Sequence, residues 1–575
     1  MDHDAITLLT FAKDASQNMR NKLLDPKHGF GLKYEQLPHV STLHSLGYEI
    51  VNAKPGAVGL RKTNLRVQSE SSVSQLLFRD AALSTGLSEE DAKAARDCKA
   101  CGDCKPTEGE GKCAVCRAYW DISLKRNYLD FDDQVLFACR ILEEDPVLLA
   151  EYRNKCRHLL VDEYQDINAA QFRLIELLSR ETLDGLFVVG DDAQSIYSFR
   201  GATPKFILGF IDDFPGAWSA PLAYSRRCHE SILGRAQSGL KKHYPNWTGP
   251  HNLEYCIPPG EEPKVWQVPS EDAEAQWVAR IARQAVSEHK TVLVLAPKSA
   301  FFPRLSRVLS RYGICHDCQE DLLPDAIDDR LSVVWQLVEW IQDQNDNFLA
   351  RLAIECAINH GTAKVAGAAK GTRCKANTIT TRVGVEAEIG RLWSAVTSRR
   401  SLMDVLEALS SPSKELCAAR SVLGSLRESY SECKGDRRGE FAKCLALACG
   451  GWIQPETLAN DLVSVKEQLT SGGPPGFSSV QLMTLRKAKG LEADVVVMVG
   501  LEDDIIPGSA DDVEEQARLF YVGMTRAKDK LYMIHSFKRP RNVSFGEDIV
   551  KKTRSRFLDA VGIKSKYMKE SAKTA

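Results

Sequence analysis

The stretch from His158 to Asp166 constrains the fold of this 575-residue chain more than any other. Its first four residues, through Val161, are too few for a helix and rich in leucine and β-branched side chains, which predicts a buried parallel strand. Three carboxylates follow within five positions, at the expected carboxyl end of that strand. At this edge of an open α/β sheet an Asp can hold Mg²⁺ and a neighbouring Glu can orient an attacking water. A plain strand followed by an Asp-rich turn has the same pattern, so the rest of the chain must distinguish the two.

Size and composition indicate a soluble protein of several domains. So long a chain exceeds one core, and roughly three to five units are expected. The hydrophobic content of 43%, the charged content of 26% and the net charge of −2 are those of an ordinary globular protein. The 17 cysteines form no small secreted framework and the N-terminus carries no signal pattern, so we expect a reducing, cytoplasmic setting. The longest strongly apolar stretch, around residues 495–501, is far below the roughly 20 residues of a membrane helix, and no membrane contact is expected.

Polar and aromatic residues follow other predicted strands in the same way. Residues 6–10 read as a strand leading into a helix, which places Thr10 and Phe11 at its carboxyl end. There a hydroxyl could meet a phosphate and a ring could stack on a base, although core packing of the ring fits the sequence equally well. A similar stretch covers residues 40–46. A third, residues 186–201, is a strand that ends in carboxylates and a glutamine, with two aromatics and an arginine just beyond, so a nucleotide site and a base-stacking surface could share one loop.

A cluster of cysteines lies in the loosely patterned stretch between residues 50 and 125. Five cysteines occur within nineteen residues: Cys98, Cys101, Cys104, Cys113 and Cys116. Two C-x2-C pairs separated by 11 residues favour a structural zinc knuckle held by Cys98, Cys101, Cys113 and Cys116, with Cys104 as a spare or substitute ligand. An iron–sulfur cluster and thiols without a metal are the alternatives.

Taken together, these blocks resemble superfamily-one DNA helicases of the UvrD/Rep/PcrA type, in that family's order. Blocks at residues 222–233, 480–492 and 518–531 are also similar to its motifs, so the resemblance covers both ends of the chain. It implies an α/β fold with two RecA-like parallel-sheet domains across an ATP site. Each domain would carry an inserted subdomain, one with the cysteine cluster and one mainly helical.

The resemblance implies a role for each residue of the ATP site. Asp162 would coordinate Mg²⁺ and Glu163 would activate water. Gln194 and Arg227 would contact the γ-phosphate, and Arg526 would neutralise charge developing on its oxygens. The remaining two positions are Arg226, which stands where an adenine-stacking tyrosine is usual, and Glu492, expected near the ribose.

The same resemblance implies a path for single-stranded DNA. Phe199 takes the place of a base-stacking tryptophan, and Arg486 the place of a common histidine. The expected DNA-binding residues are Thr10, Phe11, Thr42, His44, Tyr197, Phe199, Arg200, Thr484 and Arg486.

The expected domain boundaries follow composition and motif order. The first RecA-like domain would comprise residues 1–50 and 125–234, with the cysteine-containing insertion at 51–124. The second would comprise residues 235–358 and 476–560, with the helical insertion at 359–475, which ends in a Gly- and Pro-rich hinge. Residues 561–575 form a basic tail.

One family feature is missing from the sequence. No G-x-x-x-x-G-K-[ST] loop occurs, and such a loop cradles the phosphates, brings a Lys to them and ligates Mg²⁺. In the resembled family this loop precedes the Thr10–Phe11 block. We therefore expect either the larger part of a split or truncated helicase, with the loop supplied elsewhere or by a separate chain, or a helicase-like DNA-binding protein that does not hydrolyse ATP. The first is favoured because the residues of an ATP site are retained together: Asp162, Glu163, Gln194, Arg227 and Arg526.

The sequence thus predicts an ATP-dependent DNA helicase or translocase that moves 3′ to 5′ on single-stranded DNA, in replication, repair or recombination. Its expected cofactors are ATP, Mg²⁺ and a structural Zn²⁺. Its expected partners are single-stranded DNA and single-strand/duplex junctions.

Overall fold

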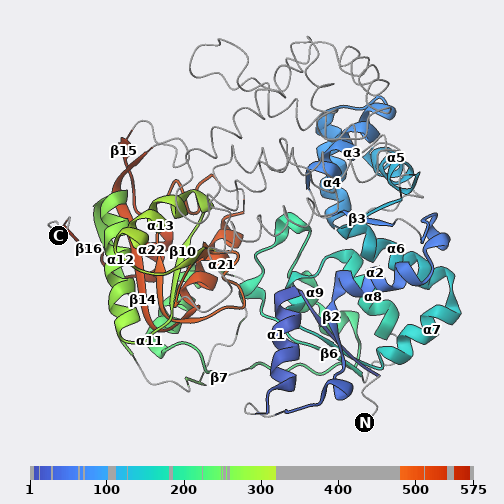
Figure 1. The fold of residues 1–575 in the computed structure, drawn as a ribbon, viewed down its shortest axis with the longest axis horizontal. Coiled ribbons are helices and arrows are strands. Elements are labelled where there is room, and N and C mark those ends of the chain that lie inside the picture. Colours follow the sequence, from blue (N-terminus) through green and yellow to red (C-terminus); the bar gives the residue numbers. More distant parts are fainter. Residues whose placement is uncertain are drawn as a thin grey trace, which may run out of the picture. The chain divides into compact units, whose positions relative to one another are not determined.

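The structure is a computed structural model, and Figure 1 draws its helices and strands as a ribbon. The chain divides into two compact units. It describes residues 5–11, 13–26, 30–62, 65–68, 71–101, 112–125, 127–179, 185–222, 224–245, 247, 249, 254–255, 260–318, 479–509, 512–540 and 549–569. The first unit comprises Met1–Glu274 and Leu485–Ala575, and the second comprises Ala275–Thr484. In both units the described strands build mainly parallel sheets flanked by helices, which confirms the predicted α/β class.

The N-terminal sheet of the first unit is four-stranded and parallel. Its order is β2 (His39–Thr42), β1 (Ile6–Thr10), β5 (His158–Val161) and β6 (Leu186–Val188). The predicted central strand at His158–Val161 is therefore confirmed, paired with β1 on one side and β6 on the other. All four carboxyl ends meet at one edge, because every pair in this sheet is parallel.

Helices pack around this sheet. They are α1 (Lys13–Leu24), α2 (Leu43–Ala53), α6 (Phe131–Glu144), α7 (Pro146–Lys155) and α8 (Ala169–Ser179). Helices α2 and α6 approach closely at Gly47, where an added Cβ would lie 2.7 Å from the carbonyl oxygen of Gln134. Two short helices, α9 (Lys205–Leu208) and α10 (Phe210–Asp213), follow β6, and β7 (Tyr224–Ser225) pairs with β8 (Glu254–Tyr255).

An insertion separates β2 from β5. Strands β3 (Arg66–Gln68) and β4 (Tyr128–Asp130) pair at its base, and helices α3 (Ser71–Ser84), α4 (Glu89–Cys101) and α5 (Lys112–Lys125) pack against one another. Phe78 and Tyr119 stack with ring centroids 4.0 Å apart in the core of this helical group. The insertion therefore has a small apolar core of its own.

A buried charged network ties the insertion to α6. The Lys99 ammonium pairs with Asp130 and lies 2.9 Å from Asp133 Oδ1. Tyr119 Oη donates to Asp130 at 2.5 Å, and Trp120 Nε1 donates to Asp133 at 2.6 Å. Burial and the neighbouring Asp130 raise the pKa of Asp133. Burial acts the same way on Asp130, but Lys99 outweighs it and holds the pKa of that carboxyl below its usual range. Removing one partner of such a buried pair typically costs ~3–5 kcal/mol, so the network fixes α4 and α5 to the start of α6.

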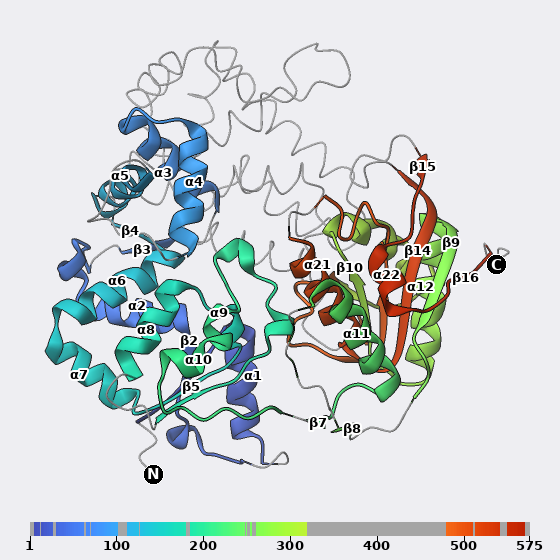
Figure 2. The same ribbon diagram turned by 180° about the vertical axis from the view of Figure 1, so that it is seen from behind.

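The C-terminal sheet of the first unit joins segments that are far apart in sequence. Its strands run in the order β13 (Ala493–Met498), β14 (Ala527–Pro540), β9 (Lys264–Ser270) and β16 (Lys566–Tyr567), and β15 (Ile549–Lys551) pairs antiparallel with β14. Figure 2 shows β9 beside β14. Helices α11 (Glu230–His243), α21 (Val513–Met524) and α22 (Arg556–Val561) pack together, and α11 contacts both others.

The second unit contains a parallel sheet of β11 (Asp317–Cys318), β12 (Val480–Thr484) and β10 (Val292–Ala296), with helix α13 (Phe302–Arg311). Helix α12 (Glu271–Ser287) follows β9 and leads to β10. The predicted helical insertion at 359–475 lies outside the described residues, as does the end of the basic tail.

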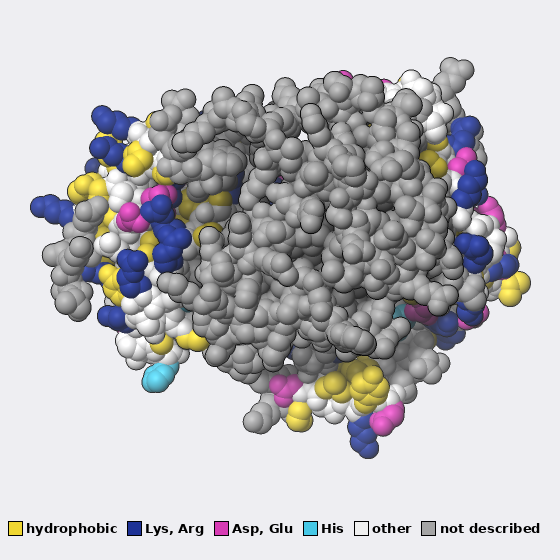
Figure 3. Space-filling view, turned by 45° about the horizontal axis from the view of Figure 1, so that its top comes forward, with side chains coloured by type: hydrophobic (Ala, Val, Ile, Leu, Met, Phe, Trp, Pro, Cys, Tyr) yellow, Lys and Arg dark blue, Asp and Glu magenta, His cyan; other side chains and the backbone are white. Residues whose placement is uncertain are grey.

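The described surface is mixed in charge. On the face drawn in Figure 3, Lys and Arg side chains occur together with Asp and Glu, in keeping with a net charge of −2. None of the helices in the described part of the chain has the length and apolarity that a bilayer crossing requires.

Candidate functional site

The candidate site lies where the strands of the N-terminal sheet end. Thr10 ends β1 and Phe11 follows it, Thr42 ends β2, and Asp162 follows β5. The turn after β5 is held on both sides, because the Asp162 amide donates to the Leu9 carbonyl oxygen at 2.9 Å and the Tyr164 amide to that of Val189 at 2.9 Å. The backbone thus fixes where the carboxylates lie.

Glu163 sits at the tightest point of this turn. Its backbone is left-handed, with φ 54° and ψ 42°, a conformation that is uncommon outside glycine and is associated with functional sites. Its amide donates to Asp162 Oδ1 at 2.9 Å, and its side chain remains about a quarter exposed, at 27%. Burial and the Glu163 charge raise the pKa of Asp162. The two carboxylates therefore lie close together at the end of β5.

Gln165 holds the turns after β5 and β6 together. Its Nε2 donates to Glu163 Oε2 at 2.5 Å, and its Oε1 accepts from the Asp191 amide at 2.9 Å. Gly190 makes room for it, because a Cβ at that position would lie 2.3 Å from Gln165 Oε1 and 2.6 Å from Ile207 Cδ1. A buried glutamine thus sets the position of the Glu163 carboxylate.

Lys489 forms ion pairs with two of the carboxylates after β5, those of Glu163 and Asp166. Its ammonium pairs with Asp166, lies 3.2 Å from Glu163 Oε2 and donates to the Gln194 carbonyl oxygen at 2.8 Å. The lysine side chain is only 5% exposed. It brings the turns after β5 and β6 to the 485–490 segment of the same unit.

Gln194 and Arg526 are also brought together. Arg526 Nη2 donates to Gln194 Oε1 at 3.2 Å, and Gln194 Nε2 donates to Asp191 Oδ2 at 2.8 Å. The Arg526 side chain is 1% exposed and its Nε donates to the Val522 carbonyl oxygen at 2.9 Å. Burial, with repulsion from Arg227, lowers the pKa of Arg526 to about 10, so the guanidinium remains charged at neutral pH.

Arg227 makes a separate ion-paired group beside Arg526. Its Nε lies 3.0 Å from Glu492 Oε2, and Lys528 Nζ lies 2.8 Å from Glu492 Oε1. Burial alone would raise the pKa of Glu492, but these two cations hold it below the usual range. The neighbouring Arg226 is exposed.

Three aromatic residues form what we call the aromatic platform: Phe11, Tyr197 and Phe199. Phe11 and Tyr197 stack with centroids 4.9 Å apart and an interplanar angle of 25°, and Phe199 lies 6.1 Å from Tyr197. Phe199 is 60% exposed. The Arg486 guanidinium carbon lies 5.0 Å from the Phe199 centroid and its side chain pairs with Glu515 at 2.7 Å. An exposed ring backed by an arginine is a surface on which a base can stack.

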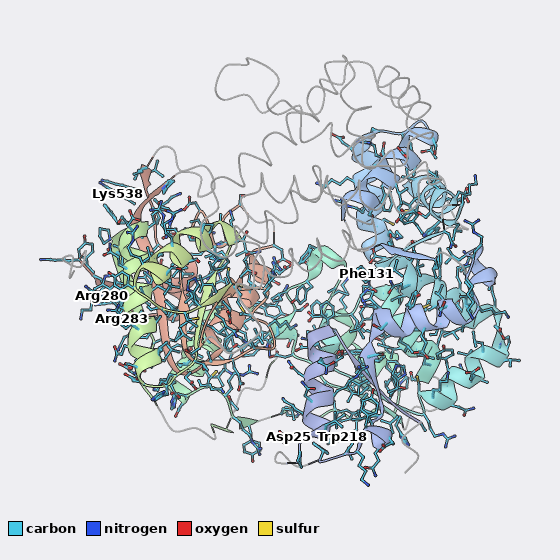
Figure 4. All side chains as sticks on the ribbon, in the orientation of Figure 1. Asp25, Phe131, Trp218, Arg280, Arg283 and Lys538 are labelled. Carbon is cyan, nitrogen blue, oxygen red and sulfur yellow. The ribbon has the colours of Figure 1, made fainter. Side chains whose placement is uncertain are left out.

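The other predicted DNA-binding residues are more dispersed. Thr10 is buried, and Thr42 uses its hydroxyl to cap α2 by accepting from the Ser45 amide at 3.1 Å. His44 lies edge-on to Phe131, 5.7 Å between centroids, and Phe131 is 45% exposed at the start of α6 (Figure 4). Thr484 ends β12 in the second unit, and the Arg200 side chain lies outside the described residues.

The cysteine pairs fall on helix ends. Cys98 and Cys101 lie in the last turn of α4, and Cys113 and Cys116 in the first turns of α5. Cys116 is buried and its Sγ donates to the Ala95 carbonyl oxygen at 3.5 Å, so α5 meets α4 close to Cys98. Cys104 and the side chains of Cys101 and Cys113 lie outside the described residues. Among those that are described, no group of three or more His, Cys, Asp or Glu could hold a metal ion.

Sequence reasoning assigned no role to three residues of this site: Gln165, Lys489 and Glu515. All three are buried polar side chains that have a partner in a distant segment. Lys489 lies in the 480–492 block that carries the family resemblance, and that position is the sequence feature that could have indicated its role.

Comparison with known proteins matches both ends of the chain. Residues 1–215 match the UvrD/REP helicase N-terminal domain, and residues 454–538 match the UvrD-like helicase C-terminal domain. The chain is 27% identical to the ATP-dependent DNA helicase Rep of Escherichia coli over 96% of its own length and 86% of the relative. It is 30% identical to UvrD1 of Mycobacterium tuberculosis, over 75% of this chain and 61% of the relative, and 28% identical to PcrA of Bacillus subtilis, over 72% and 60%. The chain therefore belongs to the UvrD/Rep family of helicases.

Proposed function

We propose that this chain is an ATP-dependent DNA helicase or translocase that moves 3′ to 5′ on single-stranded DNA. The observation that carries the proposal is the convergence of Glu163, Gln194 and Arg526 from three distant segments, with Lys489 joining them. Rep, UvrD1 and PcrA, which resemble it, are named ATP-dependent DNA helicases. A catalytic carboxylate beside a glutamine and a buried arginine suits transfer of a phosphoryl group to water.

In this proposal each residue of the site acts on ATP. Asp162 would hold Mg²⁺, which suits its carboxylate and its place beside Glu163, and the ion would neutralise charge on the phosphates when bound. Glu163, held by Gln165, orients and deprotonates the attacking water. Gln194 and Arg526 would contact the γ-phosphoryl oxygens, on which a buried cation acts most effectively.

The rest of the ATP site surrounds these groups. Arg227 would reach the γ-phosphate, and Glu492 would bind the ribose. Arg226, exposed where an aromatic residue is usual in the family, would stack its guanidinium plane on the adenine.

The DNA would lie over the aromatic platform. Phe199 presents an open face to a base, and Phe11 and Tyr197 extend the stacked surface. Stacking contributes about 1–3 kcal/mol per base without sequence preference, as a translocase requires. Thr10, Thr42, His44, Arg200, Thr484 and Arg486 remain the proposed additional DNA contacts.

The mechanism predicts that turnover depends on Glu163. We expect Glu163→Gln to lower DNA-stimulated ATP hydrolysis at least about 100-fold, because a glutamine cannot accept a proton. The measurement is phosphate release with and without single-stranded DNA. Glu144→Gln, an exposed glutamate at the end of α6, is the matched control and should retain wild-type rates.

Equal rates for the wild type and Glu163→Gln would refute the assignment of Glu163. Background hydrolysis by both proteins with tight DNA binding would support the alternative, a helicase-like DNA-binding protein without ATPase activity. That alternative is motivated by the missing G-x-x-x-x-G-K-[ST] sequence.

We further propose a structural zinc held by Cys98, Cys101, Cys113 and Cys116. The facing ends of α4 and α5 and the contact from Cys116 to Ala95 support it, since they bring the two pairs to neighbouring helix ends. Four thiolates would form a closed site that stabilises the insertion and has no open coordination position.

A further inference from the structure

The loop from Gln194 to Phe199 lies along helix α21. Three side chains of α21 and its C-terminal flank contact it in reverse order. They are Glu515, which accepts from Ser198 Oγ, Arg518, whose Nε donates to the Ser195 carbonyl oxygen at 2.8 Å, and Arg526, whose Nη2 donates to Gln194 Oε1 at 3.2 Å. At 1.5 Å per residue, the nine rises from Glu515 to Met524, the last residue of α21, span about 14 Å, and Arg526 follows two residues later. The helix therefore follows the loop from the proposed ATP site to the aromatic platform.

Glu515 is the contact at the platform end. It is only 3% exposed, and both of its carboxylate oxygens are used: Oε1 accepts from Arg486 Nη1 at 2.7 Å and Oε2 accepts from Ser198. Its backbone is fixed as well, because the amide donates to Asp512, the N-cap of α21, at 2.8 Å. A buried carboxylate with two partners in separate segments determines how those segments lie.

Arg486 connects Glu515 to the aromatic platform. Its guanidinium lies over Phe199, 5.0 Å from the ring centroid, and also donates to the Ile196 carbonyl oxygen. The Arg486 carbonyl in turn accepts from Tyr197 Oη at 3.3 Å. The arginine thus contacts the platform through its side chain and its backbone, and Glu515 holds the side chain in place.

We propose that Glu515 is a positioning residue for base stacking. It holds Arg486 and Ser198 so that Phe199 presents its open face, and α21 links that geometry to Arg526. The inference rests on the proposed binding of single-stranded DNA, and it changes the expected role of Arg486 from a direct DNA contact to the support of an aromatic ring.

The test is Glu515→Gln, which keeps the shape of the side chain and removes its charge. We expect the concentration of single-stranded oligonucleotide that half-maximally stimulates ATP hydrolysis to rise about tenfold, with the rate at saturating DNA within twofold of wild type. An oligonucleotide containing 2-aminopurine should show weaker fluorescence quenching at saturation, because the base stacks less well. Arg486→Gln should change both readouts in the same direction, which keeps the test available if one variant folds poorly.

Glu514→Gln is the matched control, since Glu514 is the adjacent residue on α21 and its side chain is 49% exposed. Wild-type stimulation and quenching for both Glu515→Gln and Arg486→Gln would overturn the inference, as would a lower saturating rate with unchanged DNA dependence. Absence of DNA-stimulated hydrolysis in the wild type would instead count against the proposed function. In that case fluorescence anisotropy of the bound oligonucleotide still measures the effect of Glu515 on DNA affinity.

Discussion

Asp166 is a buried carboxyl group at the centre of the candidate site. One of its oxygens pairs with Lys489, and the other has no hydrogen-bond partner within the described part of the chain. Burial raises the pKa of Asp166 to about 7, against the opposing effect of the Lys489 ammonium. Its protonation therefore changes within the physiological range.

This pKa predicts a pH-dependent stability. Between about pH 4 and pH 7 the folded chain keeps a proton on Asp166 that the unfolded chain releases, so this group lowers the free energy of unfolding as pH rises and has a constant effect above pH 7. We expect Asp166→Asn to remove this pH dependence. From pH 5 to 7 the free energy of unfolding of the variant should therefore rise relative to that of the wild type, by at most about 1.4 kcal/mol per pH unit. Urea unfolding at several pH values measures it. The exposed Asp121→Asn should run parallel to wild type, and a parallel curve for Asp166→Asn would contradict the prediction.

Many residues of the site were predictable from local sequence, but the hydrogen bonds and ion pairs between them were not. A short apolar run followed directly by carboxylates located Asp162 and Glu163 at a strand end, because that pattern is local. The burial of Lys489 and Gln165 was not predictable, since it depends on contacts between turns that only the folded chain brings together. A polar residue reads as exposed from sequence unless its partners are known.

Among the secondary-structure elements, too, some were predictable from the sequence and others were not. The short strand at His158–Val161 was predictable from its length and composition. The cysteine-rich stretch was expected as a knuckle, whereas the described parts of the C-x2-C pairs are helical. Three-residue spacing suits one helical turn as well as a metal-binding loop, so spacing alone cannot distinguish them.

The zinc proposal is testable at this scale. We expect about one zinc per chain by elemental analysis of protein purified without added metal, and less than half of that in Cys113→Ser, because a structural site needs all four thiolates. Cys315→Ser, at an exposed cysteine outside the cluster, should retain the metal. Wild-type protein with neither zinc nor iron would reject the proposal, and iron in place of zinc would favour the cluster alternative.

At the scale of the whole molecule, the chain returns to earlier segments to complete its sheets. Strand β9 pairs with β14, although more than two hundred residues separate them in sequence. Motif order predicted two α/β regions, but such non-local pairing cannot be derived from periodicity, which reports only neighbouring residues. The predicted boundaries of the domains and insertions remain predictions.

The direction of movement along single-stranded DNA depends on the whole molecule, and the proposed direction is 3′ to 5′. We expect ATP-dependent unwinding of a duplex with a 3′ single-stranded tail, at least tenfold faster than of the same duplex with a 5′ tail. Fluorescence of a labelled displaced strand measures both rates, and Glu163→Gln should unwind neither substrate. Preference for the 5′ tail would contradict the proposed direction while leaving the ATPase assignment intact.

Gly190 shows how a residue that bears no reactive group can limit variation at a candidate site. The space that its missing side chain leaves is occupied by Gln165, which serves two turns at once. A methyl group there would force the glutamine to release either Glu163 or the Asp191 amide. Position 190 should therefore tolerate as few substitutions as Glu163, the proposed catalytic glutamate. Among random variants that keep the fold but lose activity, substitutions at these two positions should be enriched.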